Sequence, residues 1–355
     1  MGDGWFLPLA GFFGGALLGL ASQAGRFCTH GAIEDVVFGG DSRRLRMAFL
    51  GLALAMAAVF VLQGLGLVTF DNAPLLTRPL PLLSTAIGSF LFGIGMALVG
   101  TCAFGSLARL GSGDLSGLFV AGIVGVTGYS MASGLLGDWL GVVSRPNSAL
   151  AEPQGIAHGV SALVGLPAPL VGIAVAVALA ACVLSDREFR AERHFVAWSG
   201  VLALAIVSGW LATSMEAATG FSGASVASHS YVRPLGESVI VFMTGPTGAP
   251  GFGIGAALGV IAGGAAGSLI CGTFRWQACD DARSFKRQLF GAFLMGVGGV
   301  LAFGCTIGQG LTAASVLAYS APVAMAGMFA GSWLVLQWMV RGSVAGPLRE
   351  LMRRA

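Results

Sequence analysis

Charge is what this sequence has least of. Only 10% of its 355 residues are Asp, Glu, Lys or Arg, against about 25% in ordinary soluble domains. Hydrophobic residues make up 55% of the chain, and its mean hydropathy is +0.84. This composition excludes an ordinary soluble domain, and the net charge of +3 gives no indication of a nucleic-acid partner. The sequence predicts an all-α polytopic integral membrane protein.

Motifs for catalysis, metal binding and nucleotide binding are also missing. No two cysteines have the Cys-x-x-Cys spacing of a redox pair, and no G-x-x-x-x-G-K-[ST] phosphate loop is present. The four histidines, His30, His158, His194 and His229, are too scattered to predict a metal site. We therefore expect no enzyme activity, no metal and no cofactor.

Nine charge-poor runs are long enough to be membrane spans, which need about 20 apolar residues each. They cover residues 6–23, 47–70, 82–100, 115–136, 166–185, 195–213, 251–270, 288–303 and 319–340. Sixteen of the 19 Lys and Arg residues fall on one side of this arrangement, against Arg78, Arg145 and Arg233 on the other. Because basic residues gather on the cytoplasmic side, the amino terminus is expected outside and the carboxyl terminus inside.

Two repeat-like regions of the chain, residues 82–136 and 286–340, resemble each other, and their matching residues lie at a constant offset of 203. The pairs include Gly88 with Gly291, Gly95 with Gly298, Cys102 with Cys305 and Gly105 with Gly308. In the nine-span arrangement these stretches cross the membrane in opposite directions. We therefore predict one domain, residues 1–355, with a pseudo-two-fold inverted repeat, which is an architecture typical of transporters. Residues 104–110, 238–245 and 304–318 are expected to form short re-entrant helices or loops.

Three cysteine motifs carry the chemistry of the candidate site: GRFCTHGA, GTCAFGS and FGCTIGQG. Each places a polarizable sulfur beside small residues, ahead of backbone amides that are free to face an anion. Arg233 is positioned to attract an anion to the outer mouth, although an ion pair with Glu237 accounts for it equally well. The roles of Cys271 and Cys279 stay open. The substrate path is expected to include Cys28, Cys102, Cys305, Gly105, Gly304, Gly308, Gln309 and Arg233.

These motifs, together with SHSYVRPLGES and CGTFRW, resemble the YeeE/YedE family of bacterial sulfur-transport membrane proteins. The resemblance implies an hourglass-shaped helical body in the inner membrane, with a periplasmic amino terminus and a cytoplasmic carboxyl terminus. It also implies thiosulfate as cargo, passed through transient contacts with Cys28, Cys102 and Cys305, and a cytoplasmic TusA-like sulfur-carrier partner.

Three other interpretations stay open. The cargo of a family member can be a different sulfur or selenium species. A membrane thiol oxidoreductase or sulfur relay would use Cys102 and Cys305 for redox chemistry. A scaffold that only anchors a soluble sulfur carrier would need none of the three motif cysteines.

Overall fold

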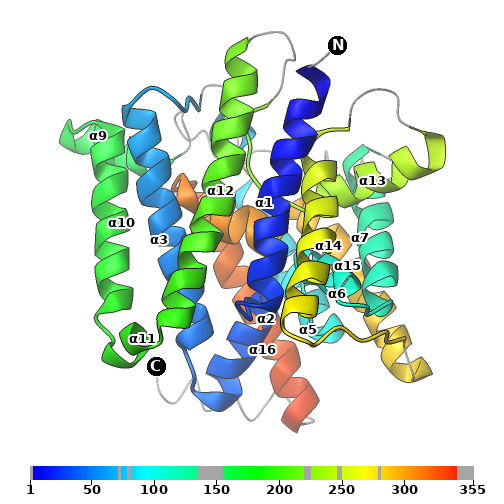
Figure 1. Cartoon of the computed structure of the whole chain (residues 1–355). Coiled ribbons are helices and arrows are strands. Elements are labelled where there is room, and N and C mark those ends of the chain that lie inside the picture. The colour runs from blue at the N-terminus through cyan, green and yellow to red at the C-terminus, as the bar shows by residue number, and fades with distance from the viewer. Residues whose placement is uncertain are drawn as a thin grey trace.

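The computed structural model describes residues 3–70, 73–77, 81–133, 155–219, 225–245, 250–278 and 281–341. Within these ranges the chain forms helices and their connections, and no strand (Figure 1). The elements are η1 (Asp3–Trp5), α1 (Phe6–Gln23), α2 (Thr29–Glu34), η2 (Asp35–Gly39), α3 (Arg43–Gly64), α4 (Pro74–Thr77), α5 (Leu82–Val99), α6 (Ala103–Gly111), α7 (Ser116–Ser133), α9 (Ile156–Val164), α10 (Ala168–Leu184), α11 (Arg187–Ala191), α12 (Arg193–Thr219), α13 (Val232–Thr244), α14 (Phe252–Ile270), α15 (Ala282–Leu301), η3 (Gly308–Ala313) and α16 (Ser320–Arg341).

The helices confirm a polytopic membrane protein. Among the described residues seven helical stretches are long and apolar enough to cross a bilayer, or eight if α9 and α10, bent by 116° at their junction, count as one span. The eighth predicted span, residues 288–303, overlaps α15, which begins earlier than expected, at charged residues, and ends at Leu301. The count of nine spans therefore stays a prediction. Residues 134–136, Arg78, Arg145, Cys279 and the tail beyond Arg341 lie outside the described ranges.

Glycines hold α1 and α14 side by side along their length. Gly11 packs on the carbonyl of Phe252, and Gly15 packs on the backbone of Ala256, so that residue numbers rise together and the helices are parallel. A side chain at either glycine would collide with the opposite backbone. Such close approach between small residues is what drives helix association where water is absent.

Helices α5 and α15, which carry the sequence repeat, run antiparallel. Gly95 packs on Gly291, and Gly298 packs on Gly88. Gly95 matches Gly298 at the offset of 203, and Gly291 matches Gly88, so the repeat converts one contact into the other. A local two-fold axis between the helices produces this relation. Likewise α16 packs against α5 as α7 packs against α15. The full inverted repeat and the hourglass shape stay predictions.

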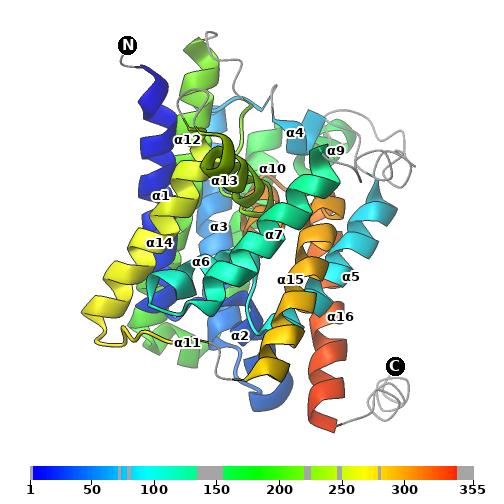
Figure 2. The same ribbon diagram turned by 90° about the vertical axis from the view of Figure 1, so that its right-hand side faces the viewer.

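The three segments expected to be re-entrant form short helices. Seven of the nine residues of α6 and all six of η3 are buried, while α13 has 13 residues, too few to span. In Figure 2, α2 and α6 lie in the lower half of the molecule and α13 in the upper half. Burial within protein is the condition under which interrupted helices are tolerated at membrane depth.

Candidate functional site

The three motif cysteines share one local geometry. Each precedes a short helical segment, and its carbonyl oxygen accepts the first helical hydrogen bond from the residue four positions later, at 2.8–2.9 Å. Each Sγ also accepts a hydrogen bond from the amide of the glycine three positions later. The pairs are Cys28 with Gly31 at 3.4 Å, Cys102 with Gly105 at 3.4 Å and Cys305 with Gly308 at 3.5 Å. The sulfur therefore caps the helical segment in place of the usual oxygen.

A left-handed residue turns the chain just before each cysteine. The residue two positions earlier has a positive φ in all three turns: 56° at Arg26, 80° at Gly100 and 57° at Phe303. This conformation is uncommon for residues other than glycine and marks a constrained turn. The repeated Cys-x-x-Gly spacing thus corresponds to a repeated structural unit, which the sequence presented as three separate motifs.

The three turns meet inside the protein. Cys102 and Cys305 are 1% and 0% exposed, whereas Cys28 is partly exposed. Cys102 lies within electrostatic range of both other thiols and near the Thr306 hydroxyl. That hydroxyl is buried and outside hydrogen-bond geometry with any partner in the described chain. The described cysteines are all free thiols.

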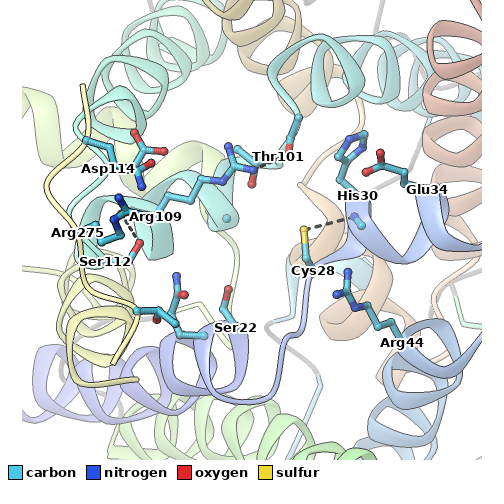
Figure 3. Close-up of a pocket in the computed structure, with 16 residues that line it drawn as sticks. Ser22, Cys28, His30, Glu34, Arg44, Thr101, Arg109, Ser112, Asp114 and Arg275 are labelled. Atoms are coloured by element: carbon cyan, nitrogen blue, oxygen red, sulfur yellow. Dashed lines mark hydrogen bonds between the residues drawn. The ribbon is translucent and has the colours of Figure 1, made fainter. Parts of the chain in front are cut away.

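A polar cavity of about 580 Å³ reaches this cluster from the end of the molecule where α2 and α6 lie (Figure 3). Of the three motif cysteines, Cys28 lines the cavity, and Gly100, Thr101 and Gly105 from around Cys102 line it as well. Cys102 and Cys305 are themselves buried and are not among the lining residues. The cavity therefore leads to Cys28 and ends at the Cys102 turn.

Three guanidinium groups border the cavity, from Arg44, Arg109 and Arg275. Arg109 extends toward Thr101 in Figure 3, and its Nη2 donates to the Gly100 carbonyl oxygen at 3.1 Å. Arg44 forms an ion pair with Asp35, with a nitrogen–oxygen distance of 3.3 Å. Glu34 and Asp114 also line the cavity, so that two carboxylates accompany Arg109, Arg275 and the paired Arg44. The guanidinium groups of Arg109 and Arg275 can therefore donate to an anion in the cavity.

His30 contributes no positive charge to this cavity near neutral pH. Its side chain is 5% exposed, and its Nδ1 has no hydrogen-bond partner among the described residues. Burial, reinforced by the positive charge of Arg109, lowers the pKa of His30 to about 4. The arginines alone therefore set the positive potential.

The other predicted site residues fall into two groups. Gly308 packs against Ser230 beside the buried cluster. Gln309 is fully engaged within the protein: its Nε2 donates to the Ala302 carbonyl at 2.8 Å, and its Oε1 accepts from Ser320 at 3.0 Å. Gly304 packs against the Gln309 side chain. Gln309 and Gly304 thus hold the Cys305 turn in shape.

Arg233 lies apart from this cluster. Its side chain is 76% exposed, and its Nε pairs with Glu237 at 2.9 Å on the surface of α13. The structure does not bring it to the cavity or to the buried thiols. Cys271 is exposed.

Sequence reasoning did not select Arg109, Arg275 or Tyr231. Helical spacing contained a signal for Arg109, because it lies seven residues after Cys102 and four after Gly105, on one face of α6. Tyr231 is fully buried, and its ring packs on Phe104 with centroids 5.4 Å apart. Phe104 also contacts Phe27 at 6.2 Å, so aromatic rings line the same region as the thiols.

Buried thiols at helix starts, a cationic cavity and a glycine-packed helical body define a membrane transport protein for an anion. The family model described as sulphur transport matches residues 24–334, and the chain belongs to this family, the YeeE/YedE family of the sequence resemblance.

Two curated relatives are similar over nearly their whole length. The thiosulfate transporter TsuA of Spirochaeta thermophila is 28% identical over 341 residues, covering 93% of this chain and 98% of the relative. The thiosulfate transporter TsuA of Escherichia coli strain K12 is 25% identical over 355 residues, covering 94% of each. Sulfur transport across a membrane is thus the activity of the group to which the chain belongs.

Proposed function

We propose that this protein imports thiosulfate across the bacterial inner membrane, passing it along Cys305, Cys102 and Cys28 into the cationic cavity. The observation that carries the proposal is the meeting of two fully buried thiols, each at the start of a helical segment, with a third thiol at the cavity wall. The names of both relatives support thiosulfate as the cargo.

The arrangement meets the main difficulty of moving a dianion through a protein interior. Removing charge from water is costly unless donors replace the hydration shell. Backbone amides and the positive dipole end of a helix supply part of that replacement at Cys102 and Cys305. Several weak neutral donors also let the ion leave again, as conduction through successive sites requires. A soft thiol suits the terminal sulfur of thiosulfate, which sulfate lacks.

The cavity is the cytoplasmic exit in this proposal. The distribution of Lys and Arg in the sequence supports that orientation, with the amino terminus periplasmic and the carboxyl terminus cytoplasmic. Arg109 and Arg275 would hold the arriving anion loosely at the wall. A TusA-like sulfur carrier docking over this opening would then receive it. The chain itself would act as a transporter and not as an enzyme.

The test is uptake of radiolabelled thiosulfate by a bacterium that lacks its own thiosulfate transporters. It would carry the intact gene or single variants Cys102→Ser and Cys305→Ser at matched membrane levels. Cys182→Ser and Cys271→Ser are matched controls, because both thiols are exposed and away from the cluster. We expect uptake with the intact protein and both controls, and its loss in the two buried-thiol variants.

Two other outcomes would redirect the assignment. Absence of uptake by the well-expressed intact protein, even with a TusA-like partner supplied, would refute thiosulfate import. Labelled selenium and sulfur oxyanions would then be tried. A disulfide or persulfide trapped on Cys102 or Cys305 during turnover would favour the oxidoreductase interpretation instead.

A further inference from the structure

Tyr231 occupies the position in α13 that Cys28 occupies in α2. Each residue directly precedes its helix, and the two are 203 residues apart, the offset that also relates Cys102 to Cys305. The neighbours correspond as well, because α2 packs against α16 and α13 against α7. Tyr231 is thus the counterpart of the third motif cysteine.

The hydroxyl of Tyr231 has no partner although it is deeply buried. The residue is 0% exposed, and no described residue forms a hydrogen bond with its Oη. Buried tyrosine hydroxyls normally find a partner, and an unsatisfied one is destabilising. An orphaned donor in such a place needs an explanation, and a passing ligand provides one.

The surroundings of Tyr231 place it at the buried thiols. Its side chain lies within electrostatic range of both Cys305 and Cys102. The segment before it is held on the η3 side, because the Thr312 hydroxyl donates to the His229 carbonyl oxygen at 2.7 Å. The ring packs between Phe104, at 5.4 Å, and His229, at 6.4 Å, measured between centroids. The hydroxyl is therefore fixed next to the path and is not free to turn toward solvent.

We propose that Tyr231 is a fourth substrate-contacting residue, whose hydroxyl donates a hydrogen bond to an oxygen of the sulfur oxyanion as it passes between Cys305 and Cys102. The inference rests on the proposed function and adds a residue to its path. A neutral phenol is a stronger donor than a thiol and suits an oxygen, whereas the thiols suit sulfur. The two kinds of donor together recognise an ion that has one sulfur end and one oxygen end.

The first test is Tyr231→Phe, which removes only the hydroxyl. Hydrogen bonds to charged groups are strong enough that we expect the KM for thiosulfate uptake to rise about tenfold or more. The other two tyrosines of the chain provide the controls Tyr129→Phe and Tyr319→Phe, which are expected to keep the KM of the unsubstituted protein. A purely structural role predicts the opposite for Tyr231→Phe: removal of an unsatisfied hydroxyl leaves uptake unchanged and the protein equally or more stable.

A second measurement strengthens the hydroxyl as a donor instead of removing it. A fluorinated tyrosine, whose phenol is a stronger hydrogen-bond donor, is incorporated at position 231, or at position 129 as control. Burial raises the pKa of the Tyr231 phenol well above its usual value, so the hydroxyl keeps its proton and can donate. The KM for thiosulfate uptake should therefore fall only for the protein substituted at 231.

The outcomes are distinguishable from those of the main proposal. Absence of uptake by the unsubstituted protein refutes thiosulfate import. Normal uptake by the unsubstituted protein, together with an unchanged KM both in Tyr231→Phe and with the fluorinated residue at position 231, overturns the role of Tyr231 alone.

Discussion

Gly105→Ala tests whether transport requires the absence of a side chain at position 105, between the cavity and Cys102. A Cβ at this position would lie 3.7 Å from the Cys102 Sγ and would collide with the Thr101 hydroxyl, which has to rotate away. The backbone amide that donates to Cys102 is retained. The added methyl therefore covers the sulfur on the side where the cavity ends, without removing a donor.

The magnitudes separate transport from stability. Alanine favours a helix over glycine by about 0.5–1 kcal/mol, and a displaced side-chain rotamer costs about 0.5–1.5 kcal/mol. The free energy of unfolding should thus change by less than about 1 kcal/mol. Overpacking by a methyl costs about 1–3 kcal/mol, and if this cost falls on the bound state of the ion, its affinity decreases about 5- to 150-fold.

The assay combines thiosulfate uptake with thermal unfolding of the purified protein in detergent. Gly122→Ala is the matched control, since nothing lies within 4 Å of a Cβ there and the helix propensity gain is the same. We expect Gly122→Ala to keep full uptake and Gly105→Ala to lose most of it at near-normal stability. Full uptake by a stable Gly105→Ala protein would refute the placement of the path along this wall.

Two further predictions concern charge. Arg109→Gln should lower uptake several-fold, because it removes a positive charge from the cavity. Arg233→Gln should leave uptake near normal, because an exposed ion pair contributes only about 0–1 kcal/mol. Equal losses of uptake in the two variants would show that Arg233 belongs to the substrate path. His30, with a pKa lowered to about 4, binds its proton more readily in the unfolded chain, where its pKa is near 6.5. Its contribution of about 3 kcal/mol should therefore be complete above pH 6.5 and be lost as pH falls toward 4. Thermal unfolding at pH 7.5 and 5 should show a smaller acid-induced decrease in His30→Gln than in the unsubstituted protein.

The sequence predicted the apolar helices well where uncharged runs end at helix-breaking residues. The first span coincides with α1, and the third ends one residue from α5. The predicted spans begin several residues after the starts of α3 and α15. The first turns of these helices contain Arg43 and Arg283, and a span predicted from hydropathy leaves out charged residues at its end. A charged side chain fits a helix end near the membrane surface, where it can reach water.

The site was predicted as a set of motifs and not as a geometry. The offset of 203 identified Cys102 and Cys305 as a pair, and the same offset already contained the match of Cys28 with Tyr231. That match had no visible chemical meaning, since the two side chains differ. Only tertiary packing reveals that the hydroxyl of Tyr231, beside the thiols, has no hydrogen-bond partner among the described residues. Gln309 was predicted on the substrate path from its motif, and packing reveals that its side chain is hydrogen-bonded to Ala302 and Ser320. Its place on the path stays a prediction.

The distribution of charge through the molecule explains why neutral donors occupy its centre. Among the described residues no Asp, Glu, Lys or Arg is buried, and the polar groups in the interior are hydroxyls, amides, thiols and imidazoles. A buried cation would bind a dianion strongly and hold it, whereas the guanidinium groups here border an open cavity. On the proposed path, an ion crossing this centre would meet weak donors first and fixed positive charge only at the open cavity. That order would give the ion a route out of the centre, and we therefore expect the hydroxyl and the thiols, not the arginines, to select the cargo.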